Sequence, residues 1–375
     1  STSRRQRQMC IRDRYMAVCV SMILFNCAVI CINKRSTKKL AKSDRRLRAE
    51  ILFQIERLKD GKKVEPDHGV WIVRRLKRIG KLLAFEETMD ALNKEDEKSA
   101  SAYLGAIYPG FIALAMYYCD GDMMEATYYA YLVNRYRIAT RGSFDFIVEA
   151  MMQLLTVPNM YCRENALHVI YRVGDAGSTV RALLQIDKSQ NCFHHSKLIH
   201  DGLLEFEGDK EKLQMEIWKQ FDRFTSHMQV ALLQYMRLSF ADCRKEVFDV
   251  MMASKQEDEV RFACMRYFGK FTYEPAYPVL LNFLANEEKR RWEYPAIAAT
   301  VLGNYKSERT IELLTESLYN SNWYIRINAA KTLAKFGVTY ADLVDVFEGN
   351  DRYAREILQY WLDSRGIESE KAVTA

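Results

Sequence analysis

The chain has 375 residues, of which 49% are hydrophobic and 28% are charged, so it can bury a large core and is not disordered by composition. Only 6 prolines and 16 glycines occur, a low content for a protein built from many β-turns. The formal net charge is +6. The composition excludes a disordered or turn-rich β protein and predicts an all-α one.

The positive charge is confined to the N-terminal fifth of the chain. Residues 1–14 carry five arginines and one aspartate, and residues 34–81 carry 17 basic and 6 acidic residues, whereas residues 15–33 carry no charge. Subtracting these from the totals of 55 basic and 49 acidic residues leaves 33 and 42 for residues 82–375, a net charge of −9. Because an acidic body repels phosphate backbones, the sequence predicts no nucleic-acid partner.

Residues 1–14 resemble the translation of a sequencing-adapter oligonucleotide, so we treat them as a probable non-native leader and exclude them from the fold argument. Residues 15–32 form an uncharged apolar run of 18 residues. As a helix this run is about 27 Å long, close to the roughly 30 Å of a bilayer core, so it predicts a single transmembrane helix. A cleaved signal peptide and a buried core helix are the alternatives, but no A-x-A-like cleavage site follows and no polar face is present.

Basic residues crowd the C-terminal flank of this segment, between Lys34 and Arg48. By the positive-inside rule, they predict that the rest of the chain faces the cytoplasm. The same residues, 34–48, are suited to contact anionic lipid, which is worth about 1 kcal/mol for each basic side chain near the surface.

The remaining chain reads as a series of helices separated by short polar turns. A charged helix over 37–60 and another from Pro66 to Leu92 make up a basic juxtamembrane segment, 33–98, which precedes a repeat domain, 99–365, and a flexible tail, 366–375. In the repeat domain we expect helices over 100–118, 122–139, 144–156, 177–186, 193–206 and 211–220, and helical pairs over 227–253, 258–284, 292–318 and 322–347.

One pattern occurs twice, 163 positions apart. Tyr161, Arg163, Asn165, Ala166 and Gly174 recur as Tyr324, Arg326, Asn328, Ala329 and Gly337. A finer period of 34 residues relates Phe268-Gly269, Leu302-Gly303 and Phe336-Gly337, and also Leu280 with Leu314 and Leu284 with Leu318. Periods of this length are typical of stacked helical units, each of which cannot bury its apolar face alone.

Val260-Arg261 with Phe268-Gly269, and Ile325-Arg326 with Ala329, Ala330 and Leu333, resemble the Val-Arg, Ala and Leu-Gly pattern of HEAT repeats over about residues 158–347. The helix expected at 292–303 departs from the pattern because it lacks the arginine. The resemblance implies a right-handed alpha-alpha superhelix, an armadillo-like solenoid, and a scaffold or adaptor rather than an enzyme. With the anchor, the chain is also similar to uncharacterised bacterial membrane proteins associated with envelope glycosyltransferases.

Arginine and asparagine at the repeated positions are candidates for contacts with a partner or with the neighbouring repeat: Arg163, Asn165, Arg326 and Asn328. The aromatic pair Trp323 and Tyr324 and the charged start of the last helix, Asp351, Arg352 and Arg355, are the other candidate partner contacts. The last helix is also suited to cap the array with a polar face.

Three histidines lie close together at His194, His195 and His200. A spacing of five residues puts His195 and His200 on different helical faces, so we expect a polar turn between repeats and no metal. No nucleotide-binding or catalytic motif is present, and the five cysteines beyond Cys31 form no C-x-x-C pair. The sequence therefore predicts no catalytic residue, cofactor or metal.

Together these observations predict a membrane-anchored cytosolic scaffold that binds a protein partner, such as an envelope-associated glycosyltransferase. Two alternatives stay open. One is a HEAT-like enzyme of the DNA glycosylase or lyase type, which needs a basic concave groove with a carboxylate. The other is a soluble repeat protein whose first helix is buried.

Overall fold

The computed structural model describes residues 44–138, 146–189, 194–239, 241–286 and 290–373, together with Met16, residues 18–23 and Phe25. The leader 1–14, most of the expected transmembrane segment 15–32 and the basic residues 34–43 lie outside the described residues. Within the segment, the described residues are helical and exposed, with Met16 at 61% and Phe25 at 69%.

The chain forms two compact units, Ser1–Val169 and Ile170–Ala375, and the boundary lies inside helix α8 (Met160–Val173). The described residues form helices and short 3-10 turns and include no strand. In the first unit, a helix over residues 44–59 precedes α2 (Pro66–Leu76), α3 (Ile79–Glu95), α4 (Glu97–Ala106), α5 (Tyr108–Cys119), α6 (Met123–Tyr136) and α7 (Phe146–Leu154).

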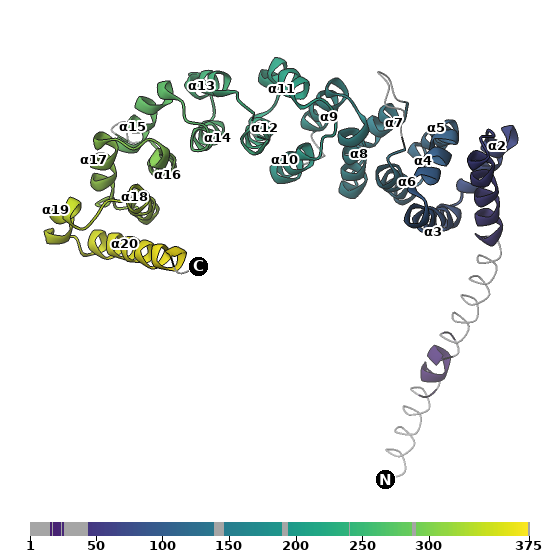
Figure 1. Ribbon diagram of the computed structural model, residues 1–375, viewed down its shortest axis with the longest axis horizontal. Coiled ribbons are helices and arrows are strands. Elements are labelled where there is room, and N and C mark those ends of the chain that lie inside the picture. The colour runs from purple at the N-terminus through teal and green to yellow at the C-terminus, as the bar shows by residue number, and fades with distance from the viewer. Residues whose placement is uncertain are drawn as a thin grey trace, which may run out of the picture. The chain divides into compact units, whose positions relative to one another are not determined.

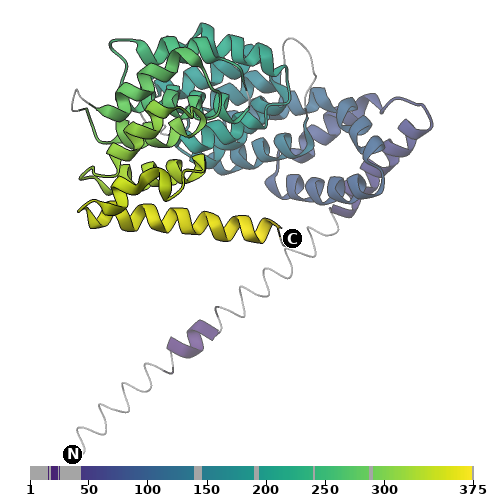
Figure 2. The same cartoon turned by 60° about the vertical axis from the view of Figure 1, so that its left-hand side comes forward.

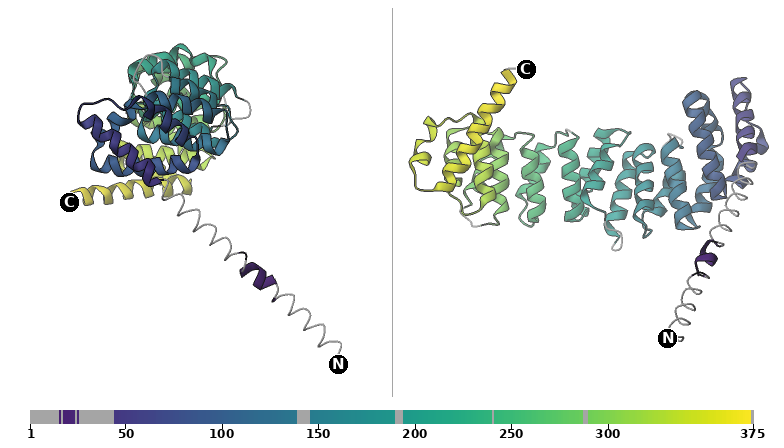
Figure 3. Two further views of the ribbon diagram at one scale, coloured as in Figure 1. Left: turned by 90° about the vertical axis from the view of Figure 1, so that its right-hand side faces the viewer. Right: turned by 90° about the horizontal axis from the view of Figure 1, so that it is seen from below.

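The second unit is built from two rows of helices (Figures 1 and 3). The inner row contains α10 (Ser196–Leu204), α12 (Ser226–Leu238), α14 (Asp258–Phe268), α16 (Glu293–Val301), α18 (Trp323–Phe336) and α20 (Arg352–Val373), and each of these contacts the next. The outer row contains α9 (Ala176–Lys188), α11 (Lys210–Lys219), α13 (Arg244–Met252), α15 (Tyr277–Ala285), α17 (Glu308–Ser317) and α19 (Val344–Glu348). This arrangement confirms an α-solenoid. The inner row ends in α20, drawn in yellow in Figure 2.

The 34-residue period corresponds to repeated core positions of the second unit. Phe268, Leu302 and Phe336 are buried, as are the two leucine pairs that follow the same step. Hydrogen bonds also join neighbouring repeats, between residues that lie about one period apart. The Tyr305 hydroxyl donates to the carbonyl of Phe268 at 3.3 Å and accepts the backbone N–H of Tyr273 at 3.0 Å.

Short polar side chains begin most of these helices, as the turn composition of the sequence suggests. In the second unit, a side-chain oxygen accepts a backbone N–H of the first turn at Asp175, Asp209, Thr225, Ser307 and Asn322. Each such cap satisfies a donor that the helix leaves without an internal partner. From α9 onward, the helices expected in the repeat domain are confirmed, and their observed ends differ from the expected ones by only a few residues.

Two expected helices are each broken into two. The helix expected over 100–118 consists of α4 and α5, which meet at an angle of 65°. The break lies at Ile107 (φ −96°, ψ 6°), two residues before Pro109. Proline lacks an N–H and its ring clashes with the preceding turn, so a straight helix cannot continue through it.

The helix expected from Pro66 to Leu92 is broken at Lys77 and Arg78, where Arg78 adopts an extended conformation (φ −111°, ψ 123°). No proline marks this break. The break leaves carbonyls at the end of α2 without a partner in the helix. The buried hydroxyl of Tyr118 donates to one of them, the carbonyl of Leu76, at 2.5 Å.

Among the described residues, no single helix has the length and apolar composition of a membrane span, although the bent pair α4 and α5 satisfies both criteria when taken together.

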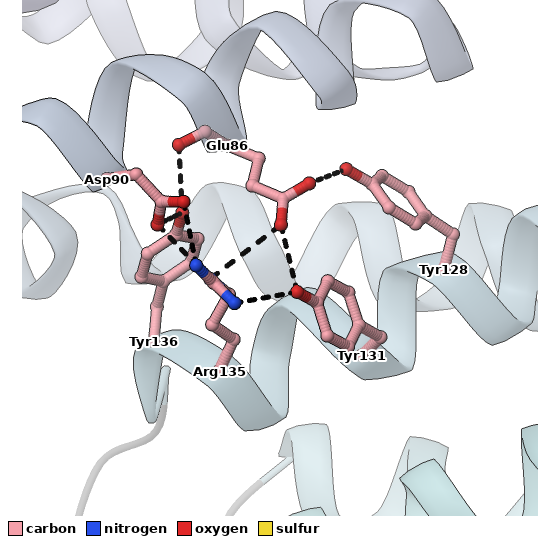
Figure 4. Close-up of polar contacts among 6 residues, drawn as sticks. All are labelled: Glu86, Asp90, Tyr128, Tyr131, Arg135 and Tyr136. Atoms are coloured by element: carbon pink, nitrogen blue, oxygen red, sulfur yellow. Dashed lines mark hydrogen bonds and ion pairs between the residues drawn. The ribbon is translucent and has the colours of Figure 1, made fainter.

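A polar network joins α3 to α6 in the first unit (Figure 4). The carboxylate of Glu86 accepts from the hydroxyls of Tyr128 and Tyr131, the latter at 2.9 Å. Arg135 donates to both carboxylate oxygens of Asp90, at 3.1 and 2.7 Å. Tyr136 completes the network by donating to Asp90 at 2.7 Å. Residues on both sides of the expected boundary between 33–98 and 99–365 thus pack within one unit.

Candidate functional site

A groove of about 500 Å³ lies along the inner row of the second unit. It is lined by one or two turns from each of α12, α14, α16 and α18, because these four helices contact one another in sequence. The lining residues are Arg237, Arg266, Gly269, Trp292, Glu293, Ala296, Ile297, Thr300, Val301, Tyr324 and Asn328. The groove therefore combines charged, aromatic and small side chains drawn from successive repeats.

Two arginines line the α12 and α14 side of the groove. Arg237 donates through Nε to the side chain of Gln234 at 3.1 Å, and no ion pair to an acidic side chain is present for Arg237 or Arg266 among the described residues. Burial lowers the pKa of the Arg266 guanidinium and Arg237 lowers it further, against the attraction of Glu259. Two arginines that line one groove without an ion pair to an acidic side chain form a site suited to an anionic group.

The acidic residues near these two arginines form ion pairs with a third arginine. Arg291 lies 2.6 Å from Glu293, 3.3 Å from Glu259 and 3.6 Å from Asp258. Its charge neutralises Glu293, the one acidic residue among the described residues that line the groove, and ties the start of α16 to the start of α14. The helix expected at 292–303 contains no arginine. Arg291, which lies just before it, makes the contact with the preceding repeat instead.

Aromatic side chains form the α16 and α18 side of the groove. The rings of Trp292 and Tyr324 are stacked, with centroids 5.3 Å apart and an interplanar angle of 24°. Trp292 is 44% exposed and Tyr324 is 56% exposed. Trp323 packs edge-on against Tyr324 at 5.4 Å. Such partly exposed, preorganised aromatic rings are typical anchors of protein interfaces.

Asn328 and Arg326, both on α18, have structural partners. Asn328 lines the groove and its Nδ2 donates to the carbonyl of Ala296 on α16 at 2.8 Å, next to a second such bond from Thr332 to Ala299 at 2.7 Å. Arg326 forms an ion pair with Asp351 of α20 at 3.0 Å. Arg326 therefore contacts the neighbouring repeat, which is one of the two roles considered for it.

Arginines that follow a turn repeatedly bind the carbonyls of the preceding turn. Arg163 donates to the carbonyls of Val157 and Pro158 at 2.7 and 2.8 Å. Further examples are Arg261, with Met251 and Ala253, Arg326, with Tyr319 and Asn320, and Arg355, with Gly349. These arginines thus bind within their own repeat as well as across repeats, since the carbonyls left open at helix ends are good acceptors.

The other predicted residues lie outside the groove. Asn165 is half-buried on α8, in the stretch of that helix that belongs to the first unit. Asp351 caps α20 by accepting the N–H of Ala354 at 2.9 Å. Arg352 is exposed and pairs along its own helix with Glu356 at 2.6 Å. These contacts suit the terminal cap that the sequence suggests.

His194 and His195 lie just before α10, whereas His200 lies within this helix. His195 caps the helix by accepting the backbone N–H of Lys197 at Nδ1, at 3.1 Å. The Nε2 atom of His227 on α12 lies 2.8 Å from the carbonyl oxygen of His194 and donates to it. Within the described ranges, no group of three or more histidine, cysteine or acidic side chains is arranged to hold a metal ion.

The sequence analysis identified Tyr324 and Asn328 but missed Arg237, Arg266 and Trp292 as groove residues. The 34-residue step contains a partial signal, because Thr300 of the groove lies 34 positions after Arg266. Which helical face lines the groove depends on the packing angles between repeats, and these angles are not encoded in a spacing.

The comparisons with known proteins concern the repeats. The family model described as HEAT repeats matches residues 287–360. The structure of human deoxyhypusine hydroxylase in complex with glycerol is similar at 15% identity and a TM-score of 0.28, over 80% of this chain and 96% of the hydroxylase. No curated protein matches the chain. The matched region and the all-helical architecture support a helical-repeat protein of the HEAT type.

The expectation that the protein is not an enzyme needs correction. An enzyme, the hydroxylase, is among the solved structures to which the chain is similar. A fold by itself does not decide function, so the helical-repeat architecture does not exclude catalysis. At this TM-score and identity, the likeness assigns no reaction to the chain.

Proposed function

We propose that this protein binds a segment of a partner protein in the groove of its second unit and holds that partner at the bacterial inner membrane. The observation that carries the proposal is the groove itself. It combines two arginines that form no ion pair among the described residues with stacked, partly exposed aromatic rings over four consecutive repeats. Repeat arrays of this kind offer extended surfaces for protein binding.

Membrane attachment by residues 15–32, with residues 34–48 against anionic lipid, is part of the same proposal. It rests on the length and composition of the apolar run and on the basic flank. An attached array raises the local concentration of its partner near the membrane, which is a function that needs only binding.

A substitution that fills the groove tests the proposal. Thr300 is exposed on the inner row, so Thr300→Trp places an indole inside the groove. The matched control is Thr315→Trp on the outer helix α17. Each variant is captured from cells in mild detergent, and proteins recovered with the wild-type protein are purified and tested for direct binding.

We expect a partner that binds the wild-type protein and Thr315→Trp, and that Thr300→Trp no longer binds. Equal binding by all three proteins shows that the groove is not the docking site, and the proposal is then wrong.

A further inference from the structure

We infer that the groove recognises a peptide segment in which an acidic side chain lies next to an aromatic or aliphatic one, the carboxylate binding between Arg237 and Arg266 and the apolar side chain packing on Trp292 and Tyr324. This inference rests on the proposed function, because it specifies the partner segment that the groove accepts.

The charge distribution selects the anion. Arg237 and Arg266 line the groove and form no ion pair with an acidic side chain among the described residues, although Glu259 attracts Arg266, whereas Glu293 is paired with Arg291 at 2.6 Å. A carboxylate placed between the two guanidiniums removes the repulsion between them and gains charge-assisted hydrogen bonds. One or two acidic side chains are enough to match two arginines.

The surroundings of the groove disfavour a polyanion. Residues 82–375 carry 33 basic and 42 acidic residues, a net charge of −9, so a nucleic-acid backbone is repelled over most of this surface. A short segment with few charges meets the local arginine pair without this cost.

The aromatic rings account for the second element of the segment. Trp292 and Tyr324 are stacked on each other, and they are 44% and 56% exposed, respectively. The stacking holds the two rings in place, and their exposed parts are open to a ligand. Ala296 and Thr300 on α16 also line the groove, and their small side chains leave room for a peptide chain. The groove thus offers arginines from α12 and α14, an aromatic pair from the start of α16 and from α18, and small side chains from α16.

The test uses a dye-labelled, end-capped hexapeptide in which two phenylalanines stand between single glutamates, with a glycine at each end. Its binding to the full chain is measured by fluorescence polarisation. Two further peptides replace the glutamates by glutamines or the phenylalanines by serines, and unlabelled inorganic phosphate serves as a competitor.

The protein variants are the double change Arg237→Gln with Arg266→Gln and a control of similar chemistry, Arg309→Gln. Arg309 lies on the outer helix α17, where its side chain is 60% exposed. We expect the double variant to weaken binding of the glutamate peptide tenfold or more, and the control to leave it unchanged. We expect both altered peptides to bind more weakly than the parent peptide.

Three results would overturn the inference. The first is no binding of the glutamate peptide, and the second is equal binding of the glutamine peptide. The third is displacement of the labelled peptide by phosphate as effectively as by the same concentration of unlabelled glutamate peptide, which indicates a general anion site. Circular dichroism of each variant checks that it is folded. If the partner from the capture experiment is lost with Thr300→Trp but kept with the double arginine variant, the proposed docking function holds and only the acidic specificity is wrong.

Discussion

The Nη1 atom of Arg326 lies 3.0 Å from both carboxylate oxygens of Asp351, and this pair joins α18 to the first turn of α20. The carboxylate also accepts the N–H of Ala354, so it holds the terminal helix in two ways. Arg326, followed by the backbone N–H of Ala354, lowers the pKa of Asp351. The last repeat is therefore attached to the array through a group whose charge depends on pH.

We predict that Asp351→Asn destabilises the second unit at neutral pH and that the difference from the wild-type protein narrows in acid. A carboxyl whose folded pKa is lowered contributes stability above its unfolded pKa, about 3.9, and loses it as the pH falls through the lower folded value. Urea unfolding at pH 7, 5 and 3.5 measures the difference. Glu312→Gln, in an exposed pair with Arg309, is the control and should change little. A difference that is constant from pH 7 to 3.5 contradicts the prediction.

The hydrogen bond from Tyr118 to the carbonyl of Leu76 gives a second prediction, for the first unit. Tyr118 is fully buried, so Tyr118→Phe leaves a carbonyl at the end of α2 with one acceptor interaction fewer and no water to replace it. We expect a loss of about 1 kcal/mol in the free energy of unfolding.

The adjacent residue provides the control for this change. Tyr117 is 43% exposed, and its ring lies under the ammonium group of Lys77 at 4.8 Å. Tyr117→Phe keeps the ring and should leave the stability nearly unchanged. Equal effects of the two substitutions in denaturant unfolding would show that the bond to Leu76 adds nothing.

Reactivity of Cys119 provides a third prediction. Burial, with smaller contributions from Cys162 and Asp120, raises the pKa of the Cys119 thiol to about 12. The thiolate is the reactive form, so at pH 8 we expect alkylation of Cys119 in the folded protein to be slower than in the unfolded chain by about a hundredfold or more. Mass spectrometry after timed treatment with iodoacetamide measures the site directly, and Cys119 in the urea-unfolded chain is the reference. An equal rate for Cys119 in the folded and the unfolded protein would contradict this.

The sequence predicts the architecture of the second unit better than that of the first. The 34-residue step of Phe268, Leu302 and Phe336 reports contacts between neighbouring repeats, and such contacts recur wherever the repeat recurs. The first unit has no such period, and its break after Leu76 depends on a hydroxyl 42 residues away at Tyr118. A local reading of the sequence cannot detect a contact of that kind.

The candidate site illustrates the same limit at the level of single residues. Tyr324 and Asn328 belong to the repeated pattern and were identified from it, and both line the groove. Arg237 and Arg266 are 29 positions apart and fit neither period, yet they face the same groove because α12 contacts α14. Their role depends on which acids remain unpaired, and the pairing of Glu293 with Arg291 is visible only in three dimensions.

Membrane attachment gives the fourth prediction. If residues 15–32 span the bilayer, the full chain should sediment with membranes and resist extraction by alkaline carbonate, because about 18 apolar residues in the hydrocarbon core are not displaced by breaking ionic contacts. Deleting residues 15–32 should move the protein to the soluble fraction. A second variant, with the basic residues 34–48 changed to glutamine and the apolar segment intact, separates the two contributions, since it should remain resistant to carbonate. Release of the full chain by carbonate would show that the attachment is peripheral, and recovery of the full chain in the cytosolic fraction would favour a buried first helix.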